Sequence, residues 1–484
     1  MERAEQPAPA PGYSSLADRE AVLAALTRLI AQAWESFERP RPEEPVIDAD
    51  LRERLAGPLP ELPADPSQVL ADAALVLDES NSPARPLYLG FIGSTGLEVG
   101  VLADALAATY DVNLAVTARA ADLVEAQAVE WVAQFIGYPC AEGAFTSGGM
   151  LSNLTALLVA RERALPGCRS EGFAGRRGAV YCSAESHHSV IRAAEAAGIG
   201  SDFVRRIAID ELRRMRVEEL EPAIAADLEQ GIVPVCVIAN GGTTLTGAVD
   251  PIVETAEVCE RHGVWLHLDG AYGLPAAATA SAAPLFAGLE RVDSVTLDAH
   301  KWLGLQKSCS LVLVREEGAL EEAFGHEEAY ILREAVQNAV ERTLEYSRPL
   351  RSLKLWLAFR THGAAAFRGW IEQTLALARD LAAKVRADPE LELSHEPMLS
   401  TVCFRHLPEG LSDTQADAHN TELAAAVQAD GRVYLASAVV DGRVCLRVCF
   451  VNFRTRPEHV AFVLETVREL GRGLRPPSAA SASA

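Results

Sequence analysis

The spacing of apolar residues near the start of the chain predicts helices. Between residues 17 and 36 one apolar stripe has the spacing of an amphipathic helix, and it is formed by Val22, Leu23, Leu26, Ile30, Ala33 and Trp34. Residues 67–78 repeat the pattern, and Pro-rich segments at 57–66 and 82–86 separate both helices from the rest. We therefore predict an N-terminal helical segment over residues 1–85, with its Pro- and Ala-rich first residues disordered.

The middle of the chain alternates between two patterns. Short apolar runs predict strands at 179–182, 203–208, 232–239, 264–269, 293–297 and 309–314. Helical patterns lie between most of them, at 188–197, 211–228 and 251–262. Alternating strands and helices are typical of a mostly parallel sheet that is covered on both faces. We predict a large α/β domain over residues 86–362.

The last part of the chain has a different character. Longer helices are predicted at 330–345, 350–362 and 364–387. After them the pattern predicts a strand at 399–405, a helix at 414–427, strands at 432–437 and 443–450, and a helix at 457–471. This order predicts a small C-terminal α+β domain over residues 363–474. The Pro-, Ser- and Ala-rich residues 475–484 are expected to be a disordered tail.

Composition narrows the possible functions. The chain has 484 residues, of which 49% are hydrophobic and 23% charged, so it is neither fibrous nor largely disordered. Its net charge of −23 argues against nucleic-acid and membrane partners. The nine cysteines include no C-x-x-C pair, and most lie in apolar runs. We therefore expect reduced thiols, no metal site and a cytoplasmic protein, with neither a signal peptide nor a membrane span.

Two strand ends carry the most informative side chains. The strand in "VWLHLDGAYG" ends at Asp269, and the strand in "DSVTLDAHKWLG" ends shortly before Lys301. Ligands of open α/β sheets bind outside the carboxyl ends of the strands, so both side chains are expected to face one crevice. An acid and a lysine suit pyridoxal phosphate, because the amine can bind its aldehyde and the acid can hold its pyridine nitrogen protonated. Separately, Asp269 could be a helix cap and Lys301 a surface lysine.

Three further motifs carry candidate chemistry. In "GAFTSGGMLSN" a turn with Thr146, Ser147 and Gly148 opens a helix, whose free amide groups suit an anion such as a phosphate. The segment "SAESHHS" offers a histidine that can stack on a flat cofactor, and "ANGGTTLTGAVDP" offers threonine hydroxyls near Asp269. Each of them alone is equally compatible with a turn, a helix cap or a surface residue.

Together, these motifs resemble the pyridoxal-phosphate-dependent group II amino acid decarboxylases, which include the aromatic amino acid and glutamate decarboxylases. The resemblance runs from about residue 82 to 470 and includes "LKLWLAFRTHG" and "CLRVCFVNFRT". It implies a fold-type I transferase with a mostly parallel seven-stranded sheet, bound pyridoxal 5'-phosphate (PLP), and a homodimer with active sites at the subunit interface. The implied reaction converts an L-amino acid to its amine and carbon dioxide.

The resemblance also implies roles for individual residues. Lys301 would be the Schiff-base lysine, Asp269 the partner of the pyridine nitrogen and His187 the stacking histidine, and these three would be catalytic. The remaining cofactor contacts would be Thr146, Ser147, Gly148, Thr244, Ala271 and His300. Arg447 resembles an arginine that meets the substrate carboxylate, although it could also be a surface residue at a strand end. Phe91 and Ser94, in "LGFIGSTG", would line the substrate pocket.

Two segments depart from the family pattern. Relatives carry a mobile loop with a tyrosine that protonates Cα, whereas residues 325–348 look helical, and neither Tyr330 nor Tyr346 matches its position. Asn240-Gly241 replaces a threonine-containing pair. A PLP-dependent lyase, an aminotransferase, an aldehyde-forming decarboxylase and a non-catalytic relative therefore remain alternatives. The absence of an extra basic cluster favours a neutral, hydrophobic or aromatic substrate over an acidic one.

Overall fold

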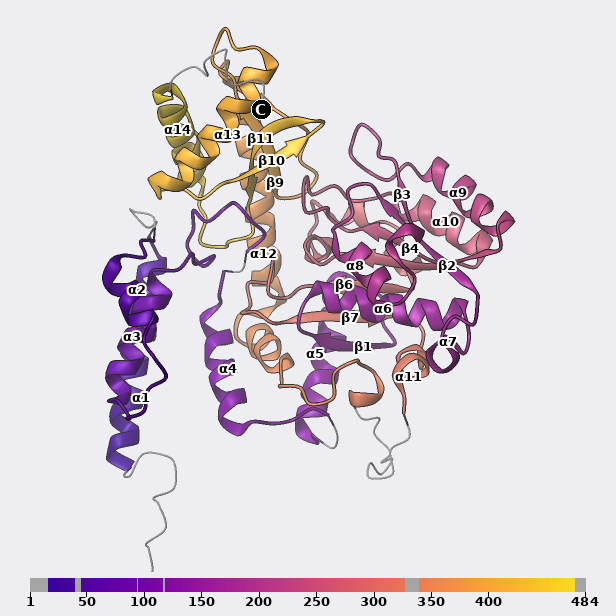
Figure 1. Cartoon of the computed structure of the whole chain (residues 1–484), viewed down its shortest axis with the longest axis horizontal. Helices are drawn as coiled ribbons and strands as arrows, with labels where there is room; N and C mark the ends of the chain where they lie inside the picture. Colours follow the sequence, from indigo (N-terminus) through magenta and orange to yellow (C-terminus); the bar gives the residue numbers. More distant parts are fainter. Residues whose placement is uncertain (1–15, 40–44, 94, 116–117, 327–338, 475–484) are drawn as a thin grey trace, which may run out of the picture.

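The structure is a computed structural model, and it describes residues 16–39, 45–93, 95–115, 118–326 and 339–474. A seven-stranded sheet forms its centre (Figure 1). The strands are β1 (Glu142–Thr146), β2 (Arg177–Ser183), β3 (Val204–Ile207), β4 (Ile232–Asn240), β5 (Trp265–Asp269), β6 (Ser294–Leu297) and β7 (Ser310–Val314). Their order is β1-β7-β6-β5-β4-β2-β3, and only β7 runs antiparallel to its neighbours. The prediction of a mostly parallel sheet is confirmed.

Helices cover both faces of this sheet, because the buried strands are apolar on both sides. One face is covered by α6 (Gly149–Ala164), α8 (Ser189–Ala196) and α11 (Ala319–Phe324), with α7 (Cys168–Glu171) beside them. The other face is covered by α5 (Ala120–Ile136), α9 (Val217–Glu229), α10 (Ile252–His262) and the start of α12 (Ser352–Ala387). Short 3-10 segments connect these elements, namely η1 (Ser201–Phe203), η2 (Leu274–Ala278), η3 (Ala283–Phe286), η4 (Leu289–Arg291) and η5 (Ala339–Glu341).

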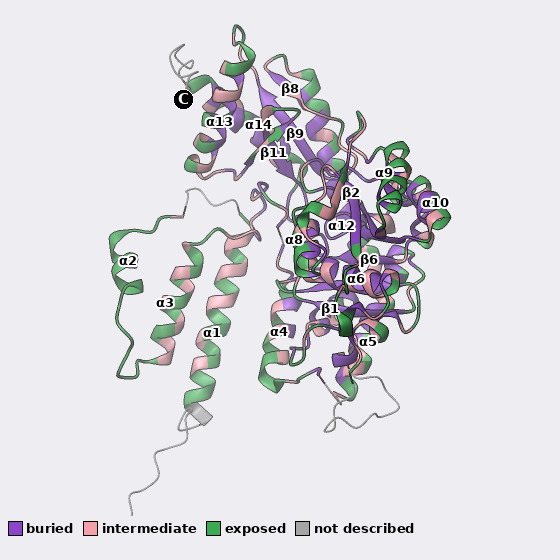
Figure 2. Ribbon diagram, turned by 45° about the vertical axis from the view of Figure 1, so that its right-hand side comes forward, coloured by how far each residue is buried: buried purple, intermediate pink, exposed green. Residues whose placement is uncertain are grey.

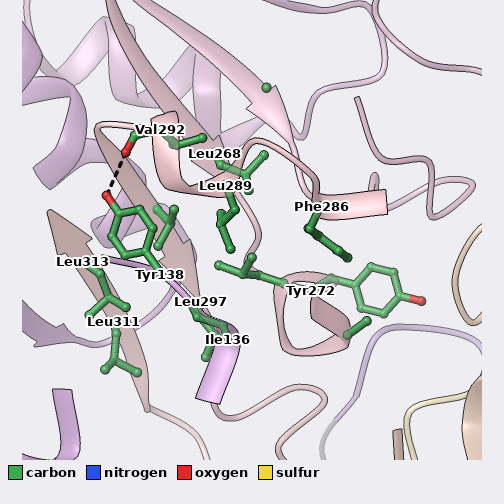
Figure 3. Packing of buried hydrophobic residues seen from close by; sticks show 14 of the residues in the cluster. Ile136, Tyr138, Leu268, Tyr272, Phe286, Leu289, Val292, Leu297, Leu311 and Leu313 are labelled. Atoms are coloured by element: carbon green, nitrogen blue, oxygen red, sulfur yellow. Dashed lines mark hydrogen bonds between the residues drawn. The ribbon is translucent and has the colours of Figure 1, made fainter. Parts of the chain in front are cut away.

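The largest hydrophobic cluster lies between the sheet and the α5 side of the molecule. Figure 3 shows part of it, where Leu268 and Leu297 point from β5 and β6 toward Tyr138 and Ile136. The Tyr138 hydroxyl donates to the carbonyl oxygen of Val292 (3.1 Å), so this buried polar group is satisfied. The core therefore holds the central strands in place and fixes where their carboxyl ends lie.

A second, antiparallel sheet lies near the C-terminus, with β8 (Leu391–Leu393), β9 (Thr401–His406), β10 (Ala436–Val440) and β11 (Arg443–Cys449) in the order β10-β11-β9-β8. Helices α13 (Asp413–Asp430) and α14 (Pro457–Gly473) pack against it. Gly363 interrupts α12 with a left-handed φ of 74°, between the two helices predicted there. The predicted domain limits at residues 85, 362 and 474 stay predictions.

The N-terminal helices stand apart from the rest of the molecule (Figures 1 and 2). They are α1 (Leu16–Phe37), α2 (Ala49–Leu55) and α3 (Pro66–Asp78), and α4 (Glu98–Tyr110) follows them. Helices α1 and α3 pack against each other, and most of their surface is exposed. Among the described helices, none combines the length and the apolar character that a membrane crossing requires.

Some predicted elements differ from the structure. Helix α9 begins at Val217 and not at residue 211, because residues 210–216 form a turn in which Arg213 has a φ of 65° and Asp210 accepts from the Arg214 amide (2.8 Å). The elements that were not predicted are strands β1 and β8 and helices α2, α4, α5, α7 and α11. Most of the helix predicted at 330–345 lies outside the described residues, and its last part contains the short segment η5.

Candidate active site

The carboxyl ends of the parallel strands meet at one edge of the central sheet, and a cavity of about 260 Å³ lies there. Of the residues predicted for the site, the cavity is lined by Gly148, His187, Thr244, Asp269, Ala271 and Lys301. The other lining residues are Gly149, Met150, Asn153, Ser189, Asn240, Gly242, Thr243, Tyr272 and Asp298. Residues from β1, β2, β4, β5 and β6 or the loops after them therefore converge on one small space.

Lys301 lies in the turn after β6. Its amide donates to the Asp298 carbonyl (3.0 Å), which closes the turn, and its Nζ forms an ion pair with Asp298 Oδ2 (2.9 Å). The Lys301 side chain is 23% exposed, whereas that of Asp298 is only 3% exposed. The other oxygen of Asp298, Oδ1, is buried and has no hydrogen-bond partner in the described part of the chain. The cavity thus contains a reachable amine next to a carboxylate with spare acceptor capacity.

Asp269, at the end of β5, is oriented from two sides. Its Oδ2 accepts from Asn153 Nδ2 on α6 (2.8 Å), and its Oδ1 accepts from the Ala271 amide (3.2 Å). The side chain is buried but still lines the cavity. A carboxylate can accept about four hydrogen bonds, so lone pairs remain for a ligand.

His187 lies at the mouth of the cavity, between β2 and α8. Its Nδ1 accepts from the Ser189 amide (3.1 Å), which fixes the orientation of an otherwise exposed ring. Desolvation by the surrounding protein lowers the pKa of His187, and nearby Lys301 adds to this, although the charge of Asp269 acts in the opposite direction. A neutral imidazole therefore faces the cavity at neutral pH, as stacking on a flat cofactor requires.

The glycine turn places the start of α6 against the cavity. A Cβ on Gly149 would lie 3.0 Å from Ala271 Cβ and 3.1 Å from Asp298 Oδ2, so a side chain here would crowd two residues that line the cavity. The first amides of a helix have no acceptor within it and can bind an anion. Ser147 is exposed, but the Thr146 hydroxyl is buried and bonded to Ser152 Oγ (2.7 Å). Thr146 and Ser147 do not line the cavity.

His300 does not line the cavity, but its ring lies behind the lining residues Gly148 and Asp298. It is buried, its Nδ1 lies 2.8 Å from the Cys309 carbonyl oxygen, and burial lowers the pKa of the ring. Its Nε2 lies 3.7 Å from Asp298 Oδ2, so His300 reaches the site through that carboxylate.

Of the residues predicted for substrate contact, Arg447 lies next to the cavity, because it binds the carbonyl oxygen of the lining residue Thr244. The Arg447 guanidinium is buried, and it donates to the carbonyl oxygens of Gly90 (2.9 Å) and Leu245 (3.1 Å) and to that of Thr244. Phe91 is 55% exposed. Ser94 and Tyr330 lie outside the described residues, whereas Tyr346 is exposed and does not line the cavity.

Several lining residues were missed by the sequence analysis. Asp298 had a usable signal, since it follows β6 directly and precedes Lys301 by three residues. Asn153 and Asn240 are amides in apolar surroundings, and only the fold brings them to the site. The Asn240 side chain donates to Asp250 Oδ2 (2.7 Å) and to Ser186 Oγ (3.1 Å).

Comparisons with known proteins agree with this geometry. The family described as "Pyridoxal-dependent decarboxylase conserved domain" matches residues 58–407. An aromatic-L-amino-acid decarboxylase of Bacillus atrophaeus is 34% identical over 89% of this chain and 91% of its own length. A cysteine sulfinic acid decarboxylase of Rattus norvegicus is 32% identical over 60% of each chain. The crystal structure of Oryza sativa TDC with PLP and tryptamine has a TM-score of 0.89 and 26% identity, and the match covers 97% of this chain and 99% of the other.

Proposed function

The chain belongs to the family of PLP-dependent amino acid decarboxylases, and from this premise we propose that it converts an aromatic or neutral hydrophobic L-amino acid to the corresponding amine and carbon dioxide. The observation that carries the proposal is the cavity in which the Lys301 amine and the Asp269 carboxylate face one space beside the start of α6. The residues present fit PLP, because the cavity offers an amine, an acid and a cradle that a side chain on Gly149 would fill.

Each residue of the cavity has its own role in holding the cofactor. When bound, PLP supplies a conjugated ring that accepts the electrons of the bond between Cα and the carboxylate. Lys301 would hold the cofactor through its amine, and Asp269 would keep a proton on the pyridine nitrogen. His187 would pack on the ring, and the amides of Gly149 and Met150 would bind the phosphate. Asp298 keeps Lys301 in position through its ion pair.

The charge of the cavity supports a substrate without an acidic side chain. Its described lining contains two carboxylates, Asp269 and Asp298, and Lys301 as its cation. A second carboxylate on the substrate would be repelled by these acids and would have no arginine in this lining to bind.

An aromatic cluster near the cavity supports an aromatic substrate. The rings of Tyr88 and Tyr434 are stacked with centroids 4.8 Å apart, and the exposed Phe91 lies 6.1 Å from Tyr434. Arg447 links this cluster to the cavity, because it binds the carbonyl oxygen of Gly90, next to Phe91, and that of the lining residue Thr244. The cluster thus offers an apolar surface for a substrate side chain that extends out of the cavity.

We also propose that the enzyme is a homodimer in a reducing compartment such as the cytoplasm. All nine cysteines are free thiols, which supports the compartment. The dimer is supported by exposed leucines on α1, α3 and α4, and by the position of Phe91, whose exposed ring a second subunit can cover.

The test of the reaction is a product assay. The PLP-loaded enzyme is given each of the twenty amino acids and cysteine sulfinate in turn, carbon dioxide is measured, and the other product is identified by mass. We expect carbon dioxide and an equimolar amine from an aromatic amino acid. Release from glutamate or cysteine sulfinate alone would contradict the proposed substrate. Release of carbon dioxide together with an aldehyde would show that the enzyme catalyses an oxidative decarboxylation and not the proposed reaction.

A substitution tests the central residue. Lys301→Ala should remove the visible absorbance of lysine-bound PLP and lower kcat by several orders of magnitude, because no other amine lines the described part of the cavity. Lys307→Ala, a few residues away and outside the lining, is the matched control. It should keep the visible absorbance and the kcat of the wild type. Retention of the absorbance in Lys301→Ala would show that another residue binds the cofactor.

A further inference from the structure

A chain of hydrogen bonds runs behind Asp269, away from the cavity. On β5, Trp265 and His267 lie on the same face as Asp269, since alternate residues of a strand share a face. His267 is buried, and its ring contacts Ser294 of β6 on one side and Asn153 of α6 on the other. The donors and acceptors of this chain can be assigned from the chemistry of its members.

The assignment begins at Trp265, because an indole N–H can only donate. It donates to Ser294 Oγ (2.8 Å). The Ser294 hydroxyl can then donate its own hydrogen to His267 Nδ1 (2.8 Å). At the other end of the chain, the Asp269 carboxylate can only accept, so Asn153 turns its Nδ2 to Asp269 and its Oδ1 to His267 Nε2, which places the ring hydrogen of a neutral His267 on Nε2. This nitrogen lies 3.1 Å from Asn153 Oδ1 and 3.3 Å from Thr296 Oγ1, and both oxygens can accept.

The last step fixes the amide of Asn153. With its oxygen accepting from His267, its Nδ2 faces Asp269 Oδ2 (2.8 Å) and Ser189 Oγ (3.1 Å). Each donor thus points toward Asp269, and a rotated Asn153 amide would place its oxygen against the carboxylate. The fixed direction of the chain therefore decides whether Asp269 meets a hydrogen-bond donor or a repelling oxygen.

We infer that His267 is a positioning residue, which acts through Asn153 to hold Asp269 as an oriented carboxylate for the pyridine nitrogen of PLP. The inference rests on PLP binding at Asp269 and not on which amino acid is the substrate. His267 touches neither substrate nor cofactor, since it does not line the cavity.

The neutrality of the ring is part of this role. Burial lowers the pKa of His267 to about 4, although nearby Asp269 opposes the shift. A neutral ring orients Asn153 without adding a positive charge near Asp269. The negative charge of Asp269 therefore stays available to a protonated pyridine ring.

The first test is independent of activity. Nitrogen NMR of 15N-histidine-labelled apoenzyme, with the His267 signal assigned by its loss in a His267→Gln variant, reports which ring nitrogen carries the hydrogen. We expect the neutral form with the hydrogen on Nε2, unchanged between pH 6 and 8. A hydrogen on Nδ1, or a charged ring at pH 7, would overturn the inference.

The second test compares variants in PLP affinity. His267→Phe removes both hydrogen bonds, and it should weaken PLP binding to the apoenzyme about tenfold or more and lower kcat with little change in KM. His267→Gln returns a donor close to the position of Nε2 and should recover most of the affinity. Leu268→Val, on the opposite face of β5, controls for lost packing and should bind PLP normally.

The outcomes are separable from the proposed function. Wild-type PLP affinity in folded His267→Phe would overturn the inference, as would an equal loss in Leu268→Val or the lack of recovery in His267→Gln. If His267→Phe does not fold, Trp265→Phe replaces it, because it removes the indole N–H with which the chain of hydrogen bonds begins. A failure of the proposed function would give a different result, because the wild-type protein itself would then show no lysine-bound PLP.

Discussion

Arg447 connects the segment that the sequence predicts at the substrate pocket with the one that it predicts at the cofactor. Its guanidinium binds the carbonyl oxygen of Gly90 and those of the adjacent residues Thr244 and Leu245, which lie far from Gly90 in the chain. The side chain is buried, so these carbonyl groups depend on it for hydrogen bonds that water would otherwise supply. The geometry supports a role in positioning these segments, alongside the carboxylate contact that the family resemblance implies.

The two roles of Arg447 predict different results. If it positions the segments, Arg447→Lys should lower the unfolding free energy of the substrate-free enzyme by about 1–3 kcal/mol, because an ammonium cannot span three carbonyls. Thermal unfolding without substrate measures this. Arg443→Lys on the same strand is the control, since its ion pair with Glu392 is partly exposed and should change stability by less than about 0.5 kcal/mol. An unchanged melting temperature with a raised KM would assign Arg447 to the substrate alone.

Residue chemistry explains which parts of the site the sequence could predict. Lys301 and Asp269 were identifiable because a charged side chain directly after an apolar strand needs a reason to be there. Asn153 and His267 gave no such signal, because a polar residue inside a helix or strand has many possible partners. Their role depends on α6 lying across β5, which only the packed fold determines.

At the scale of elements, β9 and α13 meet through two histidines. His406 Nδ1 lies 2.8 Å from His419 Nε2, and both side chains are buried. Burial, together with the smaller effect of nearby His419, lowers the pKa of His406 to about 4. The unfolded chain, with a histidine pKa near 6.5, therefore binds a proton more readily than the folded protein does. Stability is fully present above the unfolded pKa and falls as the pH decreases toward 4.

This contact predicts a measurable acid sensitivity. Between pH 7.5 and 5, His406 should cost the folded protein about 2 kcal/mol of unfolding free energy. His406→Asn keeps a polar group near Nδ1 without a titrating ring, so its stability should decline less over this range. Denaturation at several pH values measures the difference, with His262→Asn, at the surface contact with Glu221, as the control. Parallel pH profiles of wild type and His406→Asn would contradict the prediction.

The spacing of apolar residues predicted those elements whose residues are buried and therefore apolar. The central strands β4 and β5 are buried along almost their whole length, and their predicted limits lie within one residue of the observed ones. Strand β1, with the sequence "EGAFT", has too little β-forming character to be found, and it is held by pairing with β7. Helix α9 starts late because the Asp210–Arg214 turn competes with the helical pattern, which is local chemistry that periodicity does not detect.

At the scale of the whole molecule, the N-terminal helices lack a core of their own. No residue of α3 is buried, and its Val69 and Leu77 are more than half exposed, as is Leu23 on α1. Isolated helices of this length are marginal in water without packing. The chain anchors them at one end, where Arg85 donates to the Ser36 carbonyl (3.1 Å), and leaves the rest uncovered (Figure 2). In the proposed homodimer, a second copy of the chain would cover these exposed apolar residues.

Helix α4 offers the sharpest test of that dimer. Leu102, Leu106 and Tyr110 follow one another at four-residue spacing, so they share a face of α4, and each is more than half exposed. Leu102→Glu with Leu106→Glu should convert the dimer to monomers, because burying two carboxylates in an apolar interface costs several kcal/mol. Sedimentation at micromolar concentration measures the mass. Leu228→Glu, equally exposed on α9 at another part of the surface, should stay dimeric. Since the active site is proposed to lie at the interface, kcat should fall with the dimer fraction, and a double variant that stays dimeric would place the interface elsewhere.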